Sequence, residues 1–194
     1  MIDNSTTKPL QKTTISSYHP TSMNWRERGV GITRIIFGLV WVVAAILQWL
    51  PQFQNTFVTQ VAAAKAGQPD FIQGWISFWA NLVSVNPLLF ARMLATTETV
   101  IAAFLILGIF SNLTSIVGIF LSLGIWSIPE GFGGPYLPGQ TTDLGTAFPY
   151  ALLFVMLLCL SAGRYYGLDQ WFTSKLGRLG FLASGSFRRI RKKI

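Results

Sequence analysis

Two charged residues, Glu98 and Arg34, lie inside long apolar segments and are the strongest candidates for chemistry in this sequence. An ionisable residue at bilayer depth costs about 2.5–3.5 kcal/mol on insertion scales and usually faces the interior of a helix bundle. Glu98 follows Leu88 by ten residues, which places it about 15 Å along a helix. Its helical face also carries small residues, as expected where helices approach closely: Ala91, Ala95 and Ala102. The pattern predicts that Glu98 points inward, near the middle of a bilayer.

Arg34 interleaves with a second stripe of small residues, Gly31, Gly38 and Ala45. It lies only about 7 Å from the expected cytoplasmic edge, so its side chain can snorkel to the headgroups. It can instead reach Glu98, because a buried acid favours a paired or a protonated state. Both interpretations are open at this level, and Glu98 and Arg34 are the candidate catalytic residues.

A candidate pocket surrounds these charges. Trp41 lies near the expected middle of the bilayer, where its ring either fills the core or lines a pocket for a flat apolar ring. Arg92, near the outer end of its apolar segment, can pair with Glu130 or Asp143 in a loop dense in glycine and proline. The candidates for a substrate or quinone pocket are therefore Trp41, Arg92, Glu130, Tyr136 and Asp143.

Several other chemistries are excluded. The single cysteine, Cys159, excludes an internal disulfide, a paired-thiol redox site and a cysteine zinc site. The single histidine, His19, excludes a haem held by two histidines of this chain. We expect no metal site and no covalently bound cofactor. Any redox chemistry then needs a lipid quinone or a partner subunit to carry the electrons.

The composition is that of an integral membrane protein. The 194 residues are 51% hydrophobic and 11% charged, against about 25% charged residues in soluble domains. The net charge of +8 comes mostly from the two ends of the chain. That distribution is typical of membrane topology, and it argues against nucleic acid as a partner. Residues 1–24 are polar, so we expect no cleavable signal peptide.

Four segments are apolar enough to cross a bilayer, which requires about 20 residues per helix. They are residues 29–50, 88–110, 113–128 and 144–163, with prolines near their ends and a Ser111-Asn112 turn joining the second to the third. The predicted fold is an all-α integral membrane protein with a four-transmembrane-helix bundle. Residues 1–28 form a polar cytoplasmic tail, residues 29–163 the bundle domain, and residues 164–194 a basic amphipathic cytoplasmic tail.

The positions of lysine and arginine predict the orientation. Four lie in residues 1–28 and eight in residues 164–194, whereas the loop 51–87 holds only Lys65 and the loop 129–142 holds none. Basic residues accumulate on the cytoplasmic side of a membrane. Both termini should therefore be cytoplasmic and both long loops extracytoplasmic.

The loops and the tail have their own patterns. In the first loop, Asp70 can cap a helix that carries aromatic residues at helical spacing: Phe71, Trp75, Phe78 and Trp79, followed by Leu82. This helix either lies flat in the outer interface or forms a soluble cap on the spans. The second loop, PEGFGGPYLPGQTTD, is either a lid over the bundle or a plain reverse turn.

After Tyr166, the stretch GLDQWFTSKLGRLGFL resembles a second interfacial helix. The final SFRRIRKKI adds five positive charges, which either attract anionic lipid or dock a cytoplasmic partner.

Three stretches together resemble the DoxX-like family of membrane proteins: GITRIIFGLVW, TTETVIAAFLILGIFS and IPEGFGGPYLPGQTTDLGTAFPY. The resemblance covers about residues 28–165 and is greatest to the DoxD branch, the membrane subunit of thiosulfate:quinone oxidoreductase. It implies a four-helix bundle in the plasma membrane of a prokaryote. For that branch it also implies oxidation of thiosulfate to tetrathionate, with electrons passed to quinone and a DoxA-like partner subunit.

Two functions follow as expectations. In a quinone-linked oxidoreductase subunit, Arg92 would attract a small sulfur oxyanion and Glu98 would accept protons as quinone is reduced. Alternatively, the chain is a non-catalytic membrane subunit that anchors or stabilises a larger respiratory or electron-transfer complex. A small transporter is less favoured, because four spans leave little room for alternating access.

Overall fold

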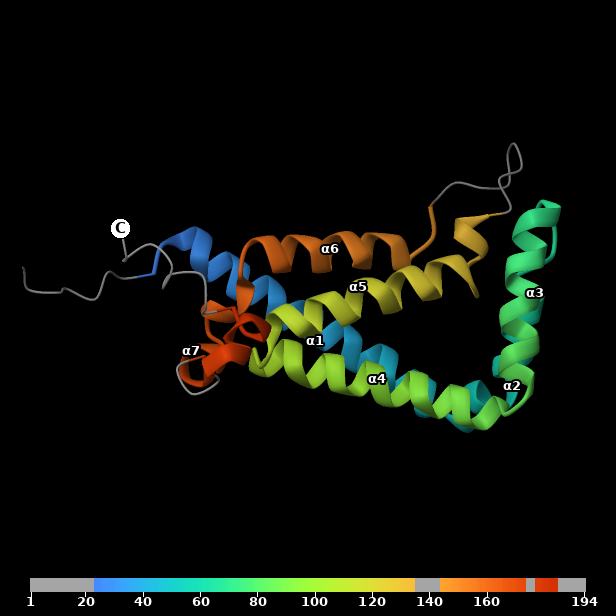
Figure 1. Ribbon diagram of the computed structural model, residues 1–194, viewed down its shortest axis with the longest axis horizontal. Helices are drawn as coiled ribbons and strands as arrows, with labels where there is room; N and C mark the ends of the chain where they lie inside the picture. Colours follow the sequence, from blue (N-terminus) through green and yellow to red (C-terminus); the bar gives the residue numbers. More distant parts are fainter. Residues whose placement is uncertain (1–22, 135–143, 174–176, 185–194) are drawn as a thin grey trace, which may run out of the picture.

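The structure is a computed structural model that describes residues 23–134, 144–173 and 177–184. Within these ranges the chain is all-helical and contains no strand. Six longer helices follow one another (Figure 1): α1 (Trp25–Trp49), α2 (Pro51–Ala63), α3 (Asp70–Ser84), α4 (Pro87–Leu107), α5 (Ser111–Ser127) and α6 (Ala147–Cys159). The short elements are η1 (Gly131–Gly133), η2 (Ala162–Arg164), α7 (Asp169–Phe172) and η3 (Gly177–Leu182).

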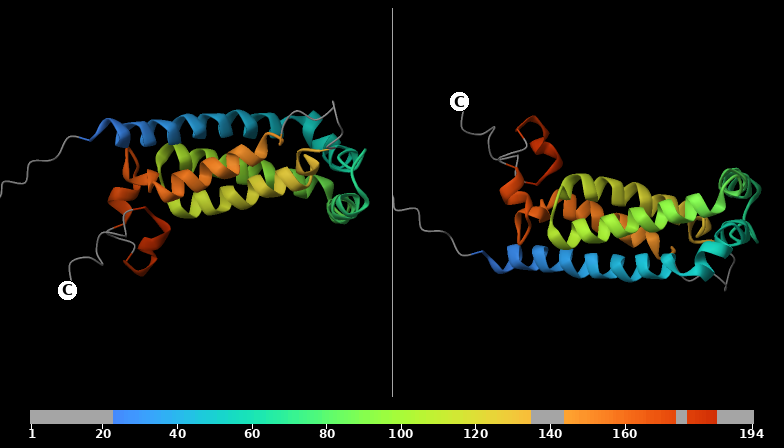
Figure 2. Two further views of the ribbon diagram at one scale, coloured as in Figure 1. Left: turned by 90° about the horizontal axis from the view of Figure 1, so that it is seen from above. Right: turned by 90° about the horizontal axis from the view of Figure 1, so that it is seen from below.

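Four helices run side by side along the long axis, with α1 against α4 and α5 against α6 (Figure 2). Helices α2 and α3 lie across one end of this bundle, which we call the α2–α3 end (Figure 1). The start of α1, the α4–α5 turn and residues 160–173 and 177–184 meet at the opposite end, which we call the tail end.

Two helices, α1 and α4, are long and apolar enough to cross a membrane. Helices α5 and α6 are apolar but shorter, with 17 and 13 residues. At 1.5 Å per residue they span about 26 Å and about 20 Å, against a hydrocarbon core of about 30 Å. The structure therefore supports two of the four predicted spans by length.

The ends of the helices correct several predicted boundaries. Helix α4 ends at Gly108, which has φ +63° in the left-handed region that glycine adopts readily. Ser111 and Asn112 belong to the first turn of α5, so they are not the predicted turn. The fourth apolar segment is helical only over Ala147–Cys159, because Ser161 has φ +50° and turns the chain. Pro149 lies in the first turn of α6, where a proline costs the helix no hydrogen bond.

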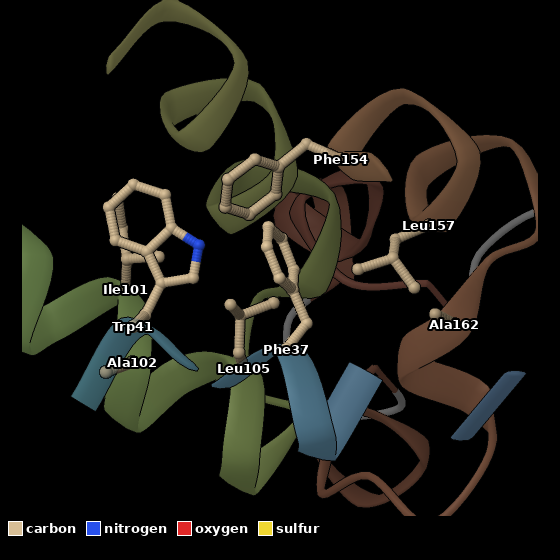
Figure 3. Packing of buried hydrophobic residues seen from close by; sticks show 8 residues of the cluster. All are labelled: Phe37, Trp41, Ile101, Ala102, Leu105, Phe154, Leu157 and Ala162. Atoms are coloured by element: carbon tan, nitrogen blue, oxygen red, sulfur yellow. The ribbon is translucent and has the colours of Figure 1, made fainter. Parts of the chain in front are cut away.

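The core lies where α1 and α4 meet α5 and α6 (Figure 3). Phe37 and Phe154 are in an edge-to-face contact, with ring centroids 4.8 Å apart, and Trp41 packs 5.6 Å from Phe154. Close approach of the helices depends on glycine at two positions. A Cβ at Gly38 would lie 2.7 Å from Ile106 Cγ1 of α4, and one at Gly118 would overlap the ring of Phe154.

The first loop contains the expected helix and a second one, α2, that was not predicted. Helix α3 covers the predicted aromatic segment, but Pro69 is its N-cap and Asp70 makes no capping hydrogen bond. Its buried face consists of Ile72, Ile76, Ala80 and Val83, whereas the aromatic residues other than Trp79 are exposed. The hydrophobic pattern identified the helix correctly but not the face that it buries. That face packs against Val61 of α2, a helix that the sequence analysis did not predict.

The part of the second loop that the structure describes packs against the α2–α3 layer. The side-chain amide of Gln68 donates to the backbone oxygen of Gly131 at 3.0 Å, and Phe132 packs on the cluster formed by Val61, Ile72, Ile76 and Ala80. This is more than a plain reverse turn, because the two loops hold each other. Residues 135–143, the rest of the predicted lid, lie outside the described residues.

The predicted helix after Tyr166 is wrong in part. The chain there forms the short elements α7 and η3 and folds back onto the α4–α5 turn. Backbone hydrogen bonds from Leu168 N to Leu107 O (3.0 Å) and from Asp169 N to Gly108 O (2.9 Å) hold it. These tertiary bonds outweigh the amphipathic pattern. The basic run 188–193 lies outside the described residues.

Candidate functional site

Glu98 is buried in the interface between α1 and α4, with 1% of its surface exposed, which confirms that it points inward. The side-chain amide of Gln48 donates to Oε1 of Glu98 at 2.6 Å. The other carboxyl oxygen, Oε2, and the amide oxygen of Gln48 are both buried without a hydrogen-bond partner. Gln54 continues the polar contacts toward the α1–α2 corner by donating to the backbone oxygen of Gln48 at 2.7 Å.

Arg34 lies far from Glu98, and the predicted pair is wrong. Arg34 and Gln48 are fourteen residues apart on α1, which is about 21 Å along the helix axis. The guanidinium is 1% exposed, so it does not snorkel to the headgroups either. Its Nη2 donates to the backbone oxygens of Tyr165 (3.3 Å) and Tyr166 (3.1 Å), whereas Nε and Nη1 have no partner among the described residues.

The carboxylate that faces Arg34 electrostatically is Asp169, a residue that the sequence analysis did not single out. Asp169 is fully buried, and its Oδ2 accepts hydrogen bonds from Ser111 N (3.0 Å) and Ser184 N (3.1 Å). The first of these satisfies a free N–H at the start of α5. One signal in the sequence was available: Asp169 is the only acidic residue in the basic stretch 164–194.

Further polar contacts lie beside Arg34 and Asp169 at the tail end. Together with Ser111, Asn112 and Ser184, these two residues form what we call the tail-end cluster. The Asn112 side chain donates to the backbone oxygen of Phe181 at 2.9 Å and accepts from Ser184 Oγ at 3.1 Å. A Cβ at Gly163 would overlap the side chains of Ser111 and Asp169. The tail-end cluster therefore connects α1, the α4–α5 turn and the C-terminal segment. We call this connection the tail-end latch.

The other predicted pocket residues do not come together. Trp41 is 2% exposed inside the core cluster, so it fills the core. Arg92 is exposed on α4. Glu130 caps α6 instead of pairing with Arg92, since its carboxylate accepts from Thr146 Oγ1 and from Ala147 N at 3.0 Å. Tyr136 and Asp143 lie outside the described residues.

The structure contains a cleft that the sequence did not reveal. Its volume is about 300 Å³, and residues of α2, α3, α4 and α5 line it. The lining is apolar and aromatic, and its rings are those of Phe57, Trp79, Phe90 and Phe120. The indole Nε1 of Trp79 is buried and has no hydrogen-bond partner among the described residues. The wrong assignment of the buried face of α3 explains why Trp79 was predicted only as an interfacial residue.

A second apolar cavity of about 230 Å³ lies between α4 and α5, toward the tail end. Thr97 lines both cavities, so they adjoin along α4. Of the predicted site residues that the structure describes, none lines either cavity. The first cleft, of about 300 Å³, is at the lower end of the size of ligand pockets, which are lined mainly by apolar and aromatic side chains.

Searches against models of protein families, curated proteins and solved structures find no match to this chain. Among the described residues, no group of three or more His, Cys, Asp and Glu side chains could hold a metal ion.

Proposed function

We propose that α1, α4, α5 and α6 all cross the plasma membrane of a prokaryotic cell, with both termini cytoplasmic. Among the described residues, five cations belong to the tail end, Arg26, Arg28, Arg34, Arg164 and Arg178, whereas Lys65 and Arg92 lie toward the α2–α3 end. Helices α5 and α6 contain no charged residue. Local thinning of the bilayer accommodates helices shorter than its core at modest cost. Helices α2 and α3 would then lie along the outer surface, with Phe71 and Phe78 exposed to the interface.

Accessibility of introduced cysteines tests this topology. In a Cys159→Ala background, Ala66→Cys at the α2–α3 end should react with an impermeant thiol reagent in intact cells. Gln170→Cys at the tail end should react only after the cells are lysed. Both positions are exposed, so burial does not limit the reaction. Reaction of Gln170→Cys alone in intact cells would reverse the orientation.

We further propose that the chain is the membrane subunit of a quinone-linked oxidoreductase, of the thiosulfate:quinone type that the resemblance implies. The observation that carries this proposal is the apolar cleft with the unpartnered indole N–H of Trp79. A quinone ring is flat and apolar, and its carbonyl oxygens accept hydrogen bonds. In such a complex Trp79 Nε1 would donate to a quinone oxygen, which would satisfy a buried donor that has no partner among the described residues.

The prenyl tail of a quinone would extend into the second cavity, past Thr97, between α4 and α5. A bound quinone supplies the electron acceptor that the side chains of this chain lack. Arg92 lies on α4, one of the helices that line the cleft, and its exposed side chain can attract an anionic substrate. Oxidation of that substrate would require a partner subunit of DoxA-like type. The basic tail would hold anionic lipids.

Quinone binding is tested by comparing two tryptophans of α3. Trp79→Phe removes the indole donor and keeps an aromatic ring, whereas Trp75→Phe changes a tryptophan that is 42% exposed and does not line the cleft. We expect Trp79→Phe to weaken binding of a short-chain quinone about two- to tenfold, the effect of about 0.5–1.5 kcal/mol for one hydrogen bond. Trp75→Phe should bind like the wild type.

The binding is measured with purified protein in mild detergent, by titration with the quinone and by extraction of co-purified quinone. Equal affinity of all three proteins, or no binding to any of them, would contradict a quinone site in this cleft.

The second candidate is a non-catalytic subunit of a larger respiratory complex. One observation favours it: Arg34, a candidate catalytic residue, serves the tail-end latch through its bonds to Tyr165 and Tyr166. Co-purification with a large complex, without bound quinone, would support this function over the first.

A further inference from the structure

The buried contact between Glu98 and Gln48 contains more acceptors than donors. The amide nitrogen of Gln48 supplies one hydrogen bond to Oε1 of Glu98 at 2.6 Å. Oε2 of Glu98 and Oε1 of Gln48 have no partner within the described residues. An ionised carboxylate only accepts hydrogen bonds, so it cannot satisfy the Gln48 oxygen. A protonated carboxyl both donates and accepts, and it can satisfy both oxygens at once.

A proton on Glu98 is still needed if the oxygen and the nitrogen of the Gln48 amide are exchanged. Their assignment is inferred from hydrogen bonding. With the amide reversed, its oxygen would face a carboxyl oxygen 2.6 Å away, a contact that requires a proton between them. In either orientation, a single proton closes a ring of two hydrogen bonds between the acid and the amide.

The charged groups on the surrounding helices do not compensate an ionised Glu98. On α1, Arg34 is bonded at the tail end, and Arg26, Glu27 and Arg28 lie still further along the helix. On α4, Arg92 is exposed six residues away, about 9 Å along the axis and on a different face. Helices α2 and α5 carry no charged residue, and α3 carries only Asp70, at its start.

We propose that Glu98 and Gln48 form a proton-binding site between α1 and α4, in which Glu98 is a neutral carboxylic acid hydrogen-bonded to the amide. The ligand is one proton, on Oε2 of Glu98 with the amide as it stands in the structure and on Oε1 with the amide reversed. The site is separate from the apolar cleft, since Thr97 lines the cleft and Glu98 does not. The Gln54 amide donates to the backbone oxygen of Gln48 at 2.7 Å, on the side of the site that faces the α1–α2 corner.

Infrared spectroscopy of the full-length protein in detergent at neutral pH tests the protonation state. A protonated carboxyl has a carbonyl band that an ionised carboxylate lacks. We expect this band in the wild type, and we expect it to shift when glutamate is labelled with heavy carbon at its side-chain carboxyl. Labelled aspartate should not shift it, although Asp169 is equally buried, because Asp169 accepts two backbone hydrogen bonds and faces Arg34.

Two variants assign the band. Glu98→Gln should remove it completely, whereas Gln48→Leu should keep it and move it to higher frequency, because the carbonyl loses its hydrogen bond. Lack of a glutamate-dependent band in the wild type would overturn the proposal without any variant. A band that persists in Glu98→Gln would overturn the assignment to Glu98, and a band unmoved in Gln48→Leu would overturn the pairing.

Discussion

Replacing Gly108 by alanine is expected to leave little folded protein in mild detergent. Gly108 adopts φ +63°, a conformation that costs other residues about 1–2 kcal/mol. A Cβ at this position would overlap Nη1 of Arg34 and lie 2.6 Å from the Cα of Gly167. Overpacking in a tight core adds about 1–3 kcal/mol. The expected loss of stability is therefore about 2–5 kcal/mol, because strain and overlap act together.

Neither neighbour can move away cheaply. Arg34 is bonded to two backbone oxygens of the C-terminal segment, and Gly167 lies beside Leu168, whose N–H donates to Leu107 O at 3.0 Å. Gly29→Ala is the matched control, since a Cβ there meets nothing within 4 Å and alanine favours the helix by up to about 1 kcal/mol. Melting in detergent, followed by size-exclusion chromatography, measures both variants. A Gly108→Ala protein that melts with the wild type would refute the close approach at the α4–α5 turn.

Replacing Asp169 by alanine should release the C-terminal segment from the bundle. The change leaves the N–H groups of Ser111 and Ser184 buried without an acceptor and removes the carboxylate that faces Arg34. Leaving a buried hydrogen-bond donor without its acceptor typically costs about 1–3 kcal/mol. Asp169→Asn keeps an acceptor oxygen of the same shape but not the charge, so it should fall between alanine and the wild type.

Limited proteolysis measures this release directly. Asp169→Ala should be cut faster than the wild type within residues 164–184, while α1 and α4 remain resistant. Glu130→Ala is the control, because it also removes a carboxylate that caps a helix, at the α2–α3 end, and it should cost only about 1 kcal/mol. Unchanged cleavage of Asp169→Ala would show that the latch does not depend on this carboxylate.

These two predictions concern the tail end, whereas the proposed quinone cleft and proton site lie toward the α2–α3 end. A variant of Trp79 or Glu98 should therefore change binding or protonation while the tail-end latch stays intact. This separation allows stability and function to be measured independently in the same protein, since distant sites usually contribute additively.

The sequence alone determined five of the six longer helices and the burial of Glu98. Apolar residues at helical spacing identified α1, α3, α4, α5 and α6, and small residues on one face of α4 identified the inward side of Glu98. These features follow from local periodicity and from the cost of exposing a charge to an apolar medium. The sequence also contained the glycine that ends α4, although the turn was predicted three residues too late.

Only the tertiary structure decided which residues the buried charges contact. Periodicity gives the face of a helix but neither its neighbour nor the axial register between them. Here Gly38 packs against Leu105 and Ile106, and this register places Gln48 beside Glu98 and leaves Arg34 about four turns away, given 3.6 residues per turn. The hydrogen-bond acceptors of Arg34 lie more than 130 residues later, at the backbone oxygens of Tyr165 and Tyr166, because a folded-back segment brings them there. Contacts between residues so distant in sequence depend on packing, which no local pattern encodes.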